Sequence, residues 1–225
     1  MKLTKFILIT LIGALLITLI GCSTVSKVKR TLSLNDLHIQ AAIAEENGDD
    51  QTAYDLWTEY VERRPNSPLA EYRLGMVETR LGLYNQATSH LRVAHDLKPG
   101  EVLYIEALAN VLALNNRTDS LMKLLRETIN EGEPGSGQLR LARYAQQAGQ
   151  MDEAREALLL AIAQSQGQTP VPYLAMADFA NGLNDSAMEI EYLRYVLWFD
   201  KSDPTILARL EALGMITGPS LAVKP

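Results

Sequence analysis

The chain has 225 residues, of which 47% are hydrophobic and 21% charged, and its formal net charge is −6 at pH 7. A single cysteine excludes an internal disulfide, and the three histidines, His38, His90 and His95, lack the spacing of a zinc pair on one helix face. The acidic excess argues against nucleic acid as a partner.

Residues 1–21 have the pattern of a targeting segment. Lys2 and Lys5 come at the start of the chain, and an apolar run extends from Phe6 to Ile20, ahead of Gly21 and Cys22. A charged start, a short apolar run and a small residue at the cut are typical of a cleaved signal peptide. An uncleaved membrane anchor, which needs about 20 apolar residues, is the alternative.

The four residues Leu19-Ile20-Gly21-Cys22 make this segment similar to a bacterial lipoprotein signal, whose lipobox they match at every position. The resemblance implies cleavage before Cys22 and lipidation of that residue, and two or three acyl chains anchor a protein stably. In enterobacteria-like sorting an aspartate after the lipidated cysteine retains a protein in the inner membrane. Because Ser23 stands there, the resemblance implies the periplasmic face of the outer membrane, with inner-membrane anchoring less favoured.

Residues 22–33 are expected to form a lipidated tether between the anchor and the folded part. Lys27, Lys29 and Arg30 give it a positive charge, whereas the remainder of the chain is strongly acidic. Such a tether would be attracted to anionic lipid headgroups. An ordinary solvated linker is the alternative interpretation.

From residue 34 to residue 202 a pattern of small residues and helix-ending residues recurs about every 34 positions. The second unit, Pro68 to Glu101, carries it most fully, with Leu74-Gly75, Gly82, Ala87, Leu91, Ala94 and Pro99. The small residue of the first helix recurs as Ala41, Ala109, Ala142 and Ala175, and the turn residue as Gly48, Asn116, Gly149 and Gly182. Small residues permit close helix contact, and glycine suits the left-handed position that ends a helix.

This spacing resembles the tetratricopeptide repeat. The resemblance implies an all-α, superhelical solenoid of about five helix-turn-helix units, with an unrelated antiparallel helical bundle as the alternative. Units three, four and five are expected to begin near Val102, Gly135 and Gln168, and the last long helix at Glu189 after a two-residue insertion. Glu131 to Gly137 is expected to be either a joint in the solenoid or an ordinary turn with extra residues.

After the repeats, residues 203–213 are expected to form a capping helix and residues 214–225 a flexible tail. Tyr192, Tyr195, Trp198 and Phe199 form one stripe on the last long helix. The capping helix is expected to cover this stripe, because a terminal repeat needs a closing partner. An exposed partner site on the same stripe is the alternative.

In tetratricopeptide solenoids the first helix of each hairpin lines a concave groove, so the resemblance assigns partner-binding positions residue by residue. They are His38, Glu45, Tyr72, Met76, Thr79, Arg80, Glu106, Asn110, Arg143, Gln146 and Phe179, accompanied by Ala42, Glu46, Leu114, Leu139, Gln147 and Met176. Such a mixed aromatic, thioether and polar floor suits an extended or helical protein segment. Tyr72, Met76 and Arg143 are expected to face one channel. About half of the set, Leu114, Leu139 and Met176 above all, could instead pack between hairpins.

The sequence contains no motif for a catalytic site, a metal or a phosphate-cradling loop. We therefore expect no enzyme activity, no cofactor and no small-molecule substrate. The interpretation is a lipid-anchored scaffold or adaptor that binds a protein segment during assembly of an envelope complex, similar in organisation to the pilotin lipoproteins of pilus or secretion systems. A structural component of an outer-membrane assembly complex and a tether for peptidoglycan hydrolases are the alternatives.

Overall fold

The structure is a computed structural model that describes residues 32–216, 218 and 220–225. The predicted signal peptide and Cys22 lie outside these residues. The described helices are α2 (Leu34–Glu46), α3 (Asp50–Arg63), α4 (Pro68–Arg80), α5 (Tyr84–Leu97), α6 (Val102–Leu114), α7 (Thr118–Glu127), α8 (Ser136–Gln147), α9 (Met151–Ser165), α10 (Val171–Gly182), α11 (Ser186–Phe199) and α12 (Pro204–Ala212).

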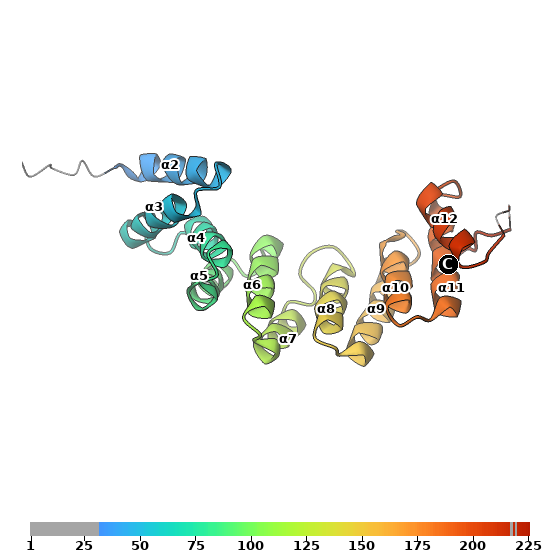
Figure 1. The fold of residues 1–225 in the computed structure, drawn as a ribbon. Coiled ribbons are helices and arrows are strands. Elements are labelled where there is room, and N and C mark those ends of the chain that lie inside the picture. The colour runs from blue at the N-terminus through green and yellow to red at the C-terminus, as the bar shows by residue number, and fades with distance from the viewer. Residues whose placement is uncertain (1–31, 217, 219) are drawn as a thin grey trace, which may run out of the picture. The chain divides into compact units, whose positions relative to one another are not determined.

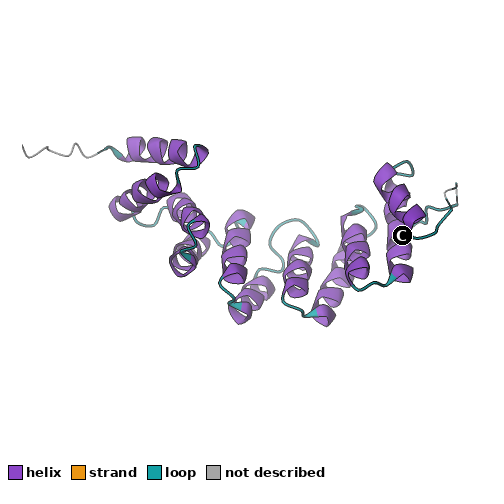
Figure 2. Cartoon of the chain, in the orientation of Figure 1, coloured by secondary structure: helices purple, strands orange, loops and turns teal. Residues whose placement is uncertain are grey.

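Residues 34–225 form one compact unit made of consecutive helical hairpins (Figure 1). The pairs are α2 with α3, α4 with α5, α6 with α7, α8 with α9, and α10 with α11, and α12 follows them. Every regular element in the described part of the chain is a helix (Figure 2). None of these helices is both long and apolar enough to cross a membrane. The predicted fold class, five helical hairpins and a closing helix, is confirmed.

One residue with positive φ marks the turn inside each hairpin, and the second helix begins two residues later. These residues are Gly48, Gly82, Asn116, Gly149 and Asn184, with φ values of 72°, 75°, 53°, 74° and 57°. Glycine adopts this left-handed conformation freely, and asparagine tolerates it better than most residues do. The five turns therefore give the register of the repeat independently of the apolar pattern.

The fifth unit corrects the sequence alignment. Gly182, predicted to be the turn residue, is the last residue of α10, and Asn184 takes the left-handed position instead. Counted from Asn184, the small residue of the first helix is Ala177, which is fully buried, and not the half-buried Ala175. The second helix accordingly begins at Ser186, three residues before the predicted Glu189. Asn184 lies 35 residues after Gly149, and Gly149 lies 33 after Asn116, so the turns keep the 34-residue period over the five units and the second helix is in normal register.

A small residue on the first helix and a large residue on the second helix are buried at fixed positions in each hairpin. The small residue lies seven positions before the turn and is buried in every unit: Ala41, Gly75, Ala109, Ala142 and Ala177. The large residue lies nine positions after the turn and is also buried: Trp57, Leu91, Leu125, Leu158 and Leu193. In the second unit the fit is tight, because a Cβ atom placed on Gly75 would be 2.6 Å from Cγ of Leu91.

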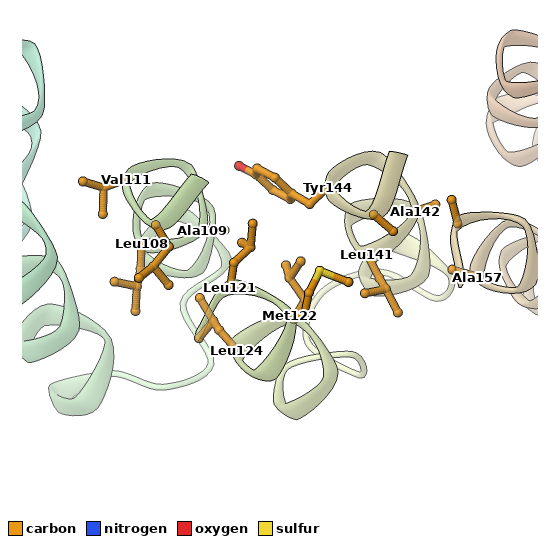
Figure 3. Packing of buried hydrophobic residues seen from close by; sticks show 14 of the residues in the cluster. Leu108, Ala109, Val111, Leu121, Met122, Leu124, Leu141, Ala142, Tyr144 and Ala157 are labelled. Atoms are coloured by element: carbon orange, nitrogen blue, oxygen red, sulfur yellow. The ribbon is translucent and has the colours of Figure 1, made fainter. Parts of the chain in front are cut away.

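The apolar core continues from one hairpin to the next. In Figure 3 Leu121 of α7 lies between α6 and α8, Leu141 of α8 lies beside Met122, and Val111 points to the opposite side of α6. The same buried cluster extends from α5 to α10. Each hairpin thus buries its apolar face against its neighbours, as expected for a repeat array.

The connection between α7 and α8 is packed against the following helix. The buried guanidinium of Arg140 donates from Nη2 to the carbonyl of Thr128 at 2.9 Å. A Cβ on Gly137 would overlap the carbonyl of Ile129, so only glycine fits at this contact. The connection from Thr128 to Gly135 is therefore an inter-repeat turn with extra residues that is fastened to α8, and the last two residues of the expected segment, Ser136 and Gly137, belong to α8.

The C-terminal end is closed by α12 and by the chain that follows it. Ile206 and Leu210 of α12 are buried with Leu193 and Leu197 of α11. The tail expected to be flexible folds back instead, because Leu221 is buried and its carbonyl accepts from Nε of Arg194 at 2.9 Å. Within the aromatic stripe, Tyr192, Tyr195 and Phe199 are partly buried against the core, and Trp198 is exposed.

The second hairpin buries two carboxylates of α4 beside a histidine of α5. Nδ1 of His90 lies 2.8 Å from Oε2 of Glu71, and its Nε2 lies 3.5 Å from Oε1 of Glu78. The remaining oxygen of Glu78 is buried without a hydrogen-bond partner. Burial raises the pKa of Glu78 to about 7, and His90 opposes this shift more strongly than Glu71 adds to it.

The close contact in the second hairpin predicts a large effect of Gly75→Leu. The new side chain would enter the space that Leu91 occupies, and overpacking of this kind costs about 1 to 3 kcal/mol of unfolding free energy. Urea unfolding of the variant should show this loss, whereas the exposed control Gln86→Leu on the same hairpin should unfold like the wild type. Equal midpoints for Gly75→Leu and the wild type would contradict the hairpin packing.

The burial of Glu78 predicts a pH dependence of stability. Its pKa is higher in the folded state than the ordinary value of 4.5, so the folded state binds the proton more tightly. The stabilisation is complete below pH 4.5 and is lost as the pH rises through about 7. Glu78→Gln should therefore match the wild type below pH 4.5 and exceed it at pH 8 by up to about 3 kcal/mol, because one pKa unit corresponds to about 1.4 kcal/mol. The exposed control Glu62→Gln should show no such pH-dependent difference. A stability profile of Glu78→Gln that runs parallel to that of the wild type across this pH range would refute the account.

Candidate functional site: a groove across the first helices of the hairpins

Two adjacent pockets lie along α4, α6, α8 and α10, the first helices of hairpins two to five. One pocket of about 450 Å³ is lined by Tyr72, Met76, Leu103, Glu106, Ala107, Asn110, Arg143, Tyr144 and Gln147. The other, of about 420 Å³, is lined by Glu106, Ser136, Leu139, Arg140, Ala142, Arg143, Gln146, Leu158, Val171, Ala175 and Asp178. We call them the α4–α8 pocket and the α6–α10 pocket. Because Glu106 and Arg143 line both, the pockets form one interrupted groove.

The α4–α8 pocket has an aromatic wall. The rings of Tyr72 on α4 and Tyr104 on α6 are 5.2 Å apart, and Tyr144 of α8 is buried on the other side. Burial is the main cause that raises the pKa of both Tyr72 and Tyr144, so their hydroxyls are neutral at physiological pH. A neutral phenol next to the thioether of Met76 offers an adaptable apolar surface with a hydrogen-bonding group.

Three charged side chains meet where the two pockets join. Oε2 of Glu106 is 2.5 Å from Nη2 of Arg143, and its Oε1 is 3.7 Å from Nη1 of Arg140. Arg143 is half exposed and lies over the ring of Tyr144, with 4.8 Å between its Cζ and the ring centre. Arg140 has only 2% of its side chain exposed, and its Nε lacks a hydrogen-bond partner.

At its α10 end the groove is lined by Asp178, whose carboxylate is paired with an arginine. Oδ1 of Asp178 accepts from Nη1 of Arg209 at 2.6 Å, and Nε of the same arginine is 2.5 Å from the buried Glu189. Arg209 belongs to the capping helix α12. The charge of Asp178 is therefore neutralised from outside the groove, and Gln146 is an uncharged polar group on the same pocket wall.

The structure brings together six of the predicted groove residues: Tyr72, Met76, Glu106, Asn110, Arg143 and Gln146. Tyr72, Met76 and Arg143 line the same pocket, as expected from the repeat register. Leu139 and Gln147 also line the groove. Partner binding by these residues is a prediction that the arrangement makes geometrically feasible.

Four predicted residues near the first two hairpins have structural contacts outside these pockets. Glu45 accepts from the indole of Trp57 at 2.8 Å and from Nη2 of Arg80 at 3.2 Å, and Arg80 also donates to Asp50 at 2.7 Å. This network joins hairpins one and two. His38 lies edge-on to Trp57, with 5.4 Å between the ring centres. The hydroxyl of Thr79 donates to the carbonyl of Gly75 on its own helix.

The prediction of Phe179 as a groove residue is wrong, since only 4% of it is exposed and it belongs to the core. Met176, 1% exposed, is also in the core. Both errors come from aligning the fifth unit on Gly182. The residue actually at the groove position is Asp178, which the sequence pattern does not identify, and the same holds for Arg140, Tyr144 and Ala175. The signal that could have located Asp178 is Asn184, a turn-compatible residue two positions after Gly182.

No arrangement of three His, Cys, Asp or Glu side chains suited to a metal ion occurs among the described residues. The groove offers hydrogen bonds, ion pairs and apolar contacts to a partner. The side chains that supply them come from separate helices, which are held in register by the hairpin core. This is the construction expected of a binding surface on repeated helical units.

No family model matches the sequence, and no curated protein matches it. Solved structures do match the fold. The crystal structure of MamA has a TM-score of 0.58 at 16% identity, covering 83% of this chain and 98% of that one. YrrB, a TPR protein with an unusual peptide-binding site, has a TM-score of 0.52 at 14% identity, covering 80% and 92%. PilF of Pseudomonas aeruginosa has a TM-score of 0.53 at 15% identity, covering 80% and 82%. These likenesses establish a tetratricopeptide-repeat fold.

Proposed function

We propose that this chain is a lipid-anchored adaptor that holds a segment of a partner protein in the groove formed by the α4–α8 and α6–α10 pockets. The observation that carries the proposal is the continuity of these pockets across four first helices, with Glu106 and Arg143 common to both. Two adjacent pockets with common lining residues favour an elongated ligand, because each pocket accepts only part of it. The peptide-binding site of YrrB, a protein of similar fold, gives further support.

The dimensions of the groove suit a short extended segment. The groove extends over four first helices, because α4, α6, α8 and α10 all contribute residues to its lining. An extended chain rises about 3.3 Å per residue, so a segment of several residues is needed to reach both pockets. The proposed ligand is therefore an extended segment with apolar side chains for the aromatic wall.

The membrane part of the proposal rests on the sequence. Leu19-Ile20-Gly21-Cys22 behind a short apolar run supports a lipid on Cys22, and Ser23 supports the periplasmic face of an outer membrane. Anchoring would restrict the groove to partners near the membrane. A role in assembling an envelope complex, such as that of a pilotin in pilus or secretion systems, follows from this combination.

The lipid assignment predicts that Cys22 is the labelled residue. In cells that express the full chain and are fed a radioactive fatty acid, the wild-type protein should become labelled. Cys22→Ala should abolish the label and the shift in gel mobility that cleavage of the signal peptide produces. Ser23→Ala, the matched control, should be labelled like the wild type. Undiminished labelling of Cys22→Ala would eliminate lipidation at this site.

The groove assignment predicts that filling the α4–α8 pocket blocks capture. Asn110 is exposed on its wall, so Asn110→Trp should occlude the pocket without disturbing the core. Pulldown from envelope extract should recover the partner at least about fivefold less well, the loss expected when a central contact is removed. Lys123→Trp, on the exposed side of α7, is the control and should capture the partner normally. Equal capture by both variants would move the interaction surface elsewhere on the solenoid.

A further inference from the structure

The charged residues at the junction of the two pockets are unequal in number. Two guanidinium groups, those of Arg140 and Arg143, share the single carboxylate of Glu106. Among the described residues no other carboxylate lies within 4 Å of either group, and Asp178 on the same pocket wall is paired with Arg209. The junction therefore carries one uncompensated positive charge in a chain whose net charge is −6.

The sharing is also unequal in geometry. Glu106 lies 2.5 Å from the half-exposed Arg143 but 3.7 Å from Arg140. The guanidinium of Arg140 keeps one hydrogen bond, to the carbonyl of Thr128, and its buried Nε has no partner. A buried cation with so few partners is costly, and a carboxylate brought closer to it would lower that cost. Arg140 is thus a second cation with which the carboxylate of Glu106 can form a close ion pair.

From these observations we propose that the partner segment carries a carboxylate in the middle of its length, which binds Arg143 while Glu106 moves onto Arg140. This inference rests on the groove being the binding site. After the exchange each guanidinium has its own carboxylate. The ion pair between Glu106 and Arg143, which lies where the two pockets join, is then broken. Exchange is feasible because an ion pair at a partly exposed site contributes little net stability.

The position of Arg143 indicates whether the carboxylate belongs to a side chain of the segment or to its carboxyl terminus. The residue lines both pockets, so a segment that fills the groove extends past it in both directions. An Asp or Glu side chain inside the segment fits this place, whereas a chain terminus would leave one pocket empty. The flanking residues should be apolar on the side of Tyr72 and Met76, because these form the α4–α8 wall. Arginine suits the role, since its planar donors hold a carboxylate in a fixed orientation.

The test uses the full chain in a non-ionic detergent and three pools of 12-residue peptides. In the first pool a central glutamate is fixed and the other positions are randomised among neutral residues, with acetylated and amidated ends. The second pool replaces the glutamate by glutamine. The third has the central glutamine and a free carboxyl terminus. Immobilised protein is incubated with an equal mixture at 150 mM and at 500 mM salt, and retained peptides are counted by mass spectrometry.

Wild type should retain the glutamate pool roughly tenfold over the glutamine pool, the usual strength of a charge-assisted hydrogen bond. Arg143→Gln should remove that preference and leave some retention of both pools. Glu106→Gln should increase retention of the glutamate pool, because no internal carboxylate then competes for Arg143. A merely structural role of Glu106 would reduce retention of both pools instead. Arg126→Gln, an exposed arginine paired with Glu153, is the charge-matched control and should behave like the wild type.

Each contrary outcome has a separate meaning. Equal retention of the glutamate and glutamine pools would overturn the carboxylate inference and leave groove binding in place. Retention of neither pool would overturn both. A preference for the free-terminus pool would overturn the internal position of the carboxylate. Loss of the preference in Arg126→Gln as well, or its disappearance at 500 mM salt, would reduce it to general attraction between charges.

Discussion

The contact between a small residue on the first helix and a large residue on the second sets the geometry of this protein. In the second hairpin these residues are Gly75 and Leu91, and no side-chain atom could be added to Gly75 without displacing the leucine. The same two positions are buried in all five hairpins. The first helices carry most of the pocket-lining residues, so their place in each hairpin determines where the pockets lie. A looser hairpin would shift the groove walls and separate the residues that line it.

Much of this architecture is predictable from the sequence because its causes are local. A left-handed turn residue, a buried small residue and a buried large residue recur at fixed separations, and each has a physical reason that any single unit displays. The second unit alone is sufficient to locate Tyr72 and Met76 correctly. The fifth unit fails because its turn comes 35 residues after the preceding turn, and Gly182, 33 residues after it, is a more obvious turn signal than Asn184. Moving the alignment by two residues exchanges groove and core, as the buried Met176 and the groove residue Asp178 demonstrate.

Other features depend on contacts between distant residues, which the pattern of a single unit does not contain. Glu45 and Arg80 have the sequence positions of groove residues, but Trp57 and Asp50 engage them from the neighbouring helix. The tail is short and contains glycine and proline, which favours a loose segment. It is held by burial of Leu221 against α11 and by Arg194, whose side chain donates to the carbonyl of Leu221 and whose own carbonyl accepts from the backbone N–H of Val223. Arg140 has no distinguishing motif, because its importance comes from sharing Glu106 with Arg143.

The central claim is that the partner lies against α4, α6, α8 and α10. A photo-crosslinking amino acid tests it in living cells and does not require the partner to be identified first. The photoreactive side chain would be placed at Asn110, on the groove wall, and separately at Lys123, on the exposed side of α7. Our account predicts a discrete crosslinked product from position 110 and none from position 123. The same product from both positions, or a product from position 123 alone, would contradict it.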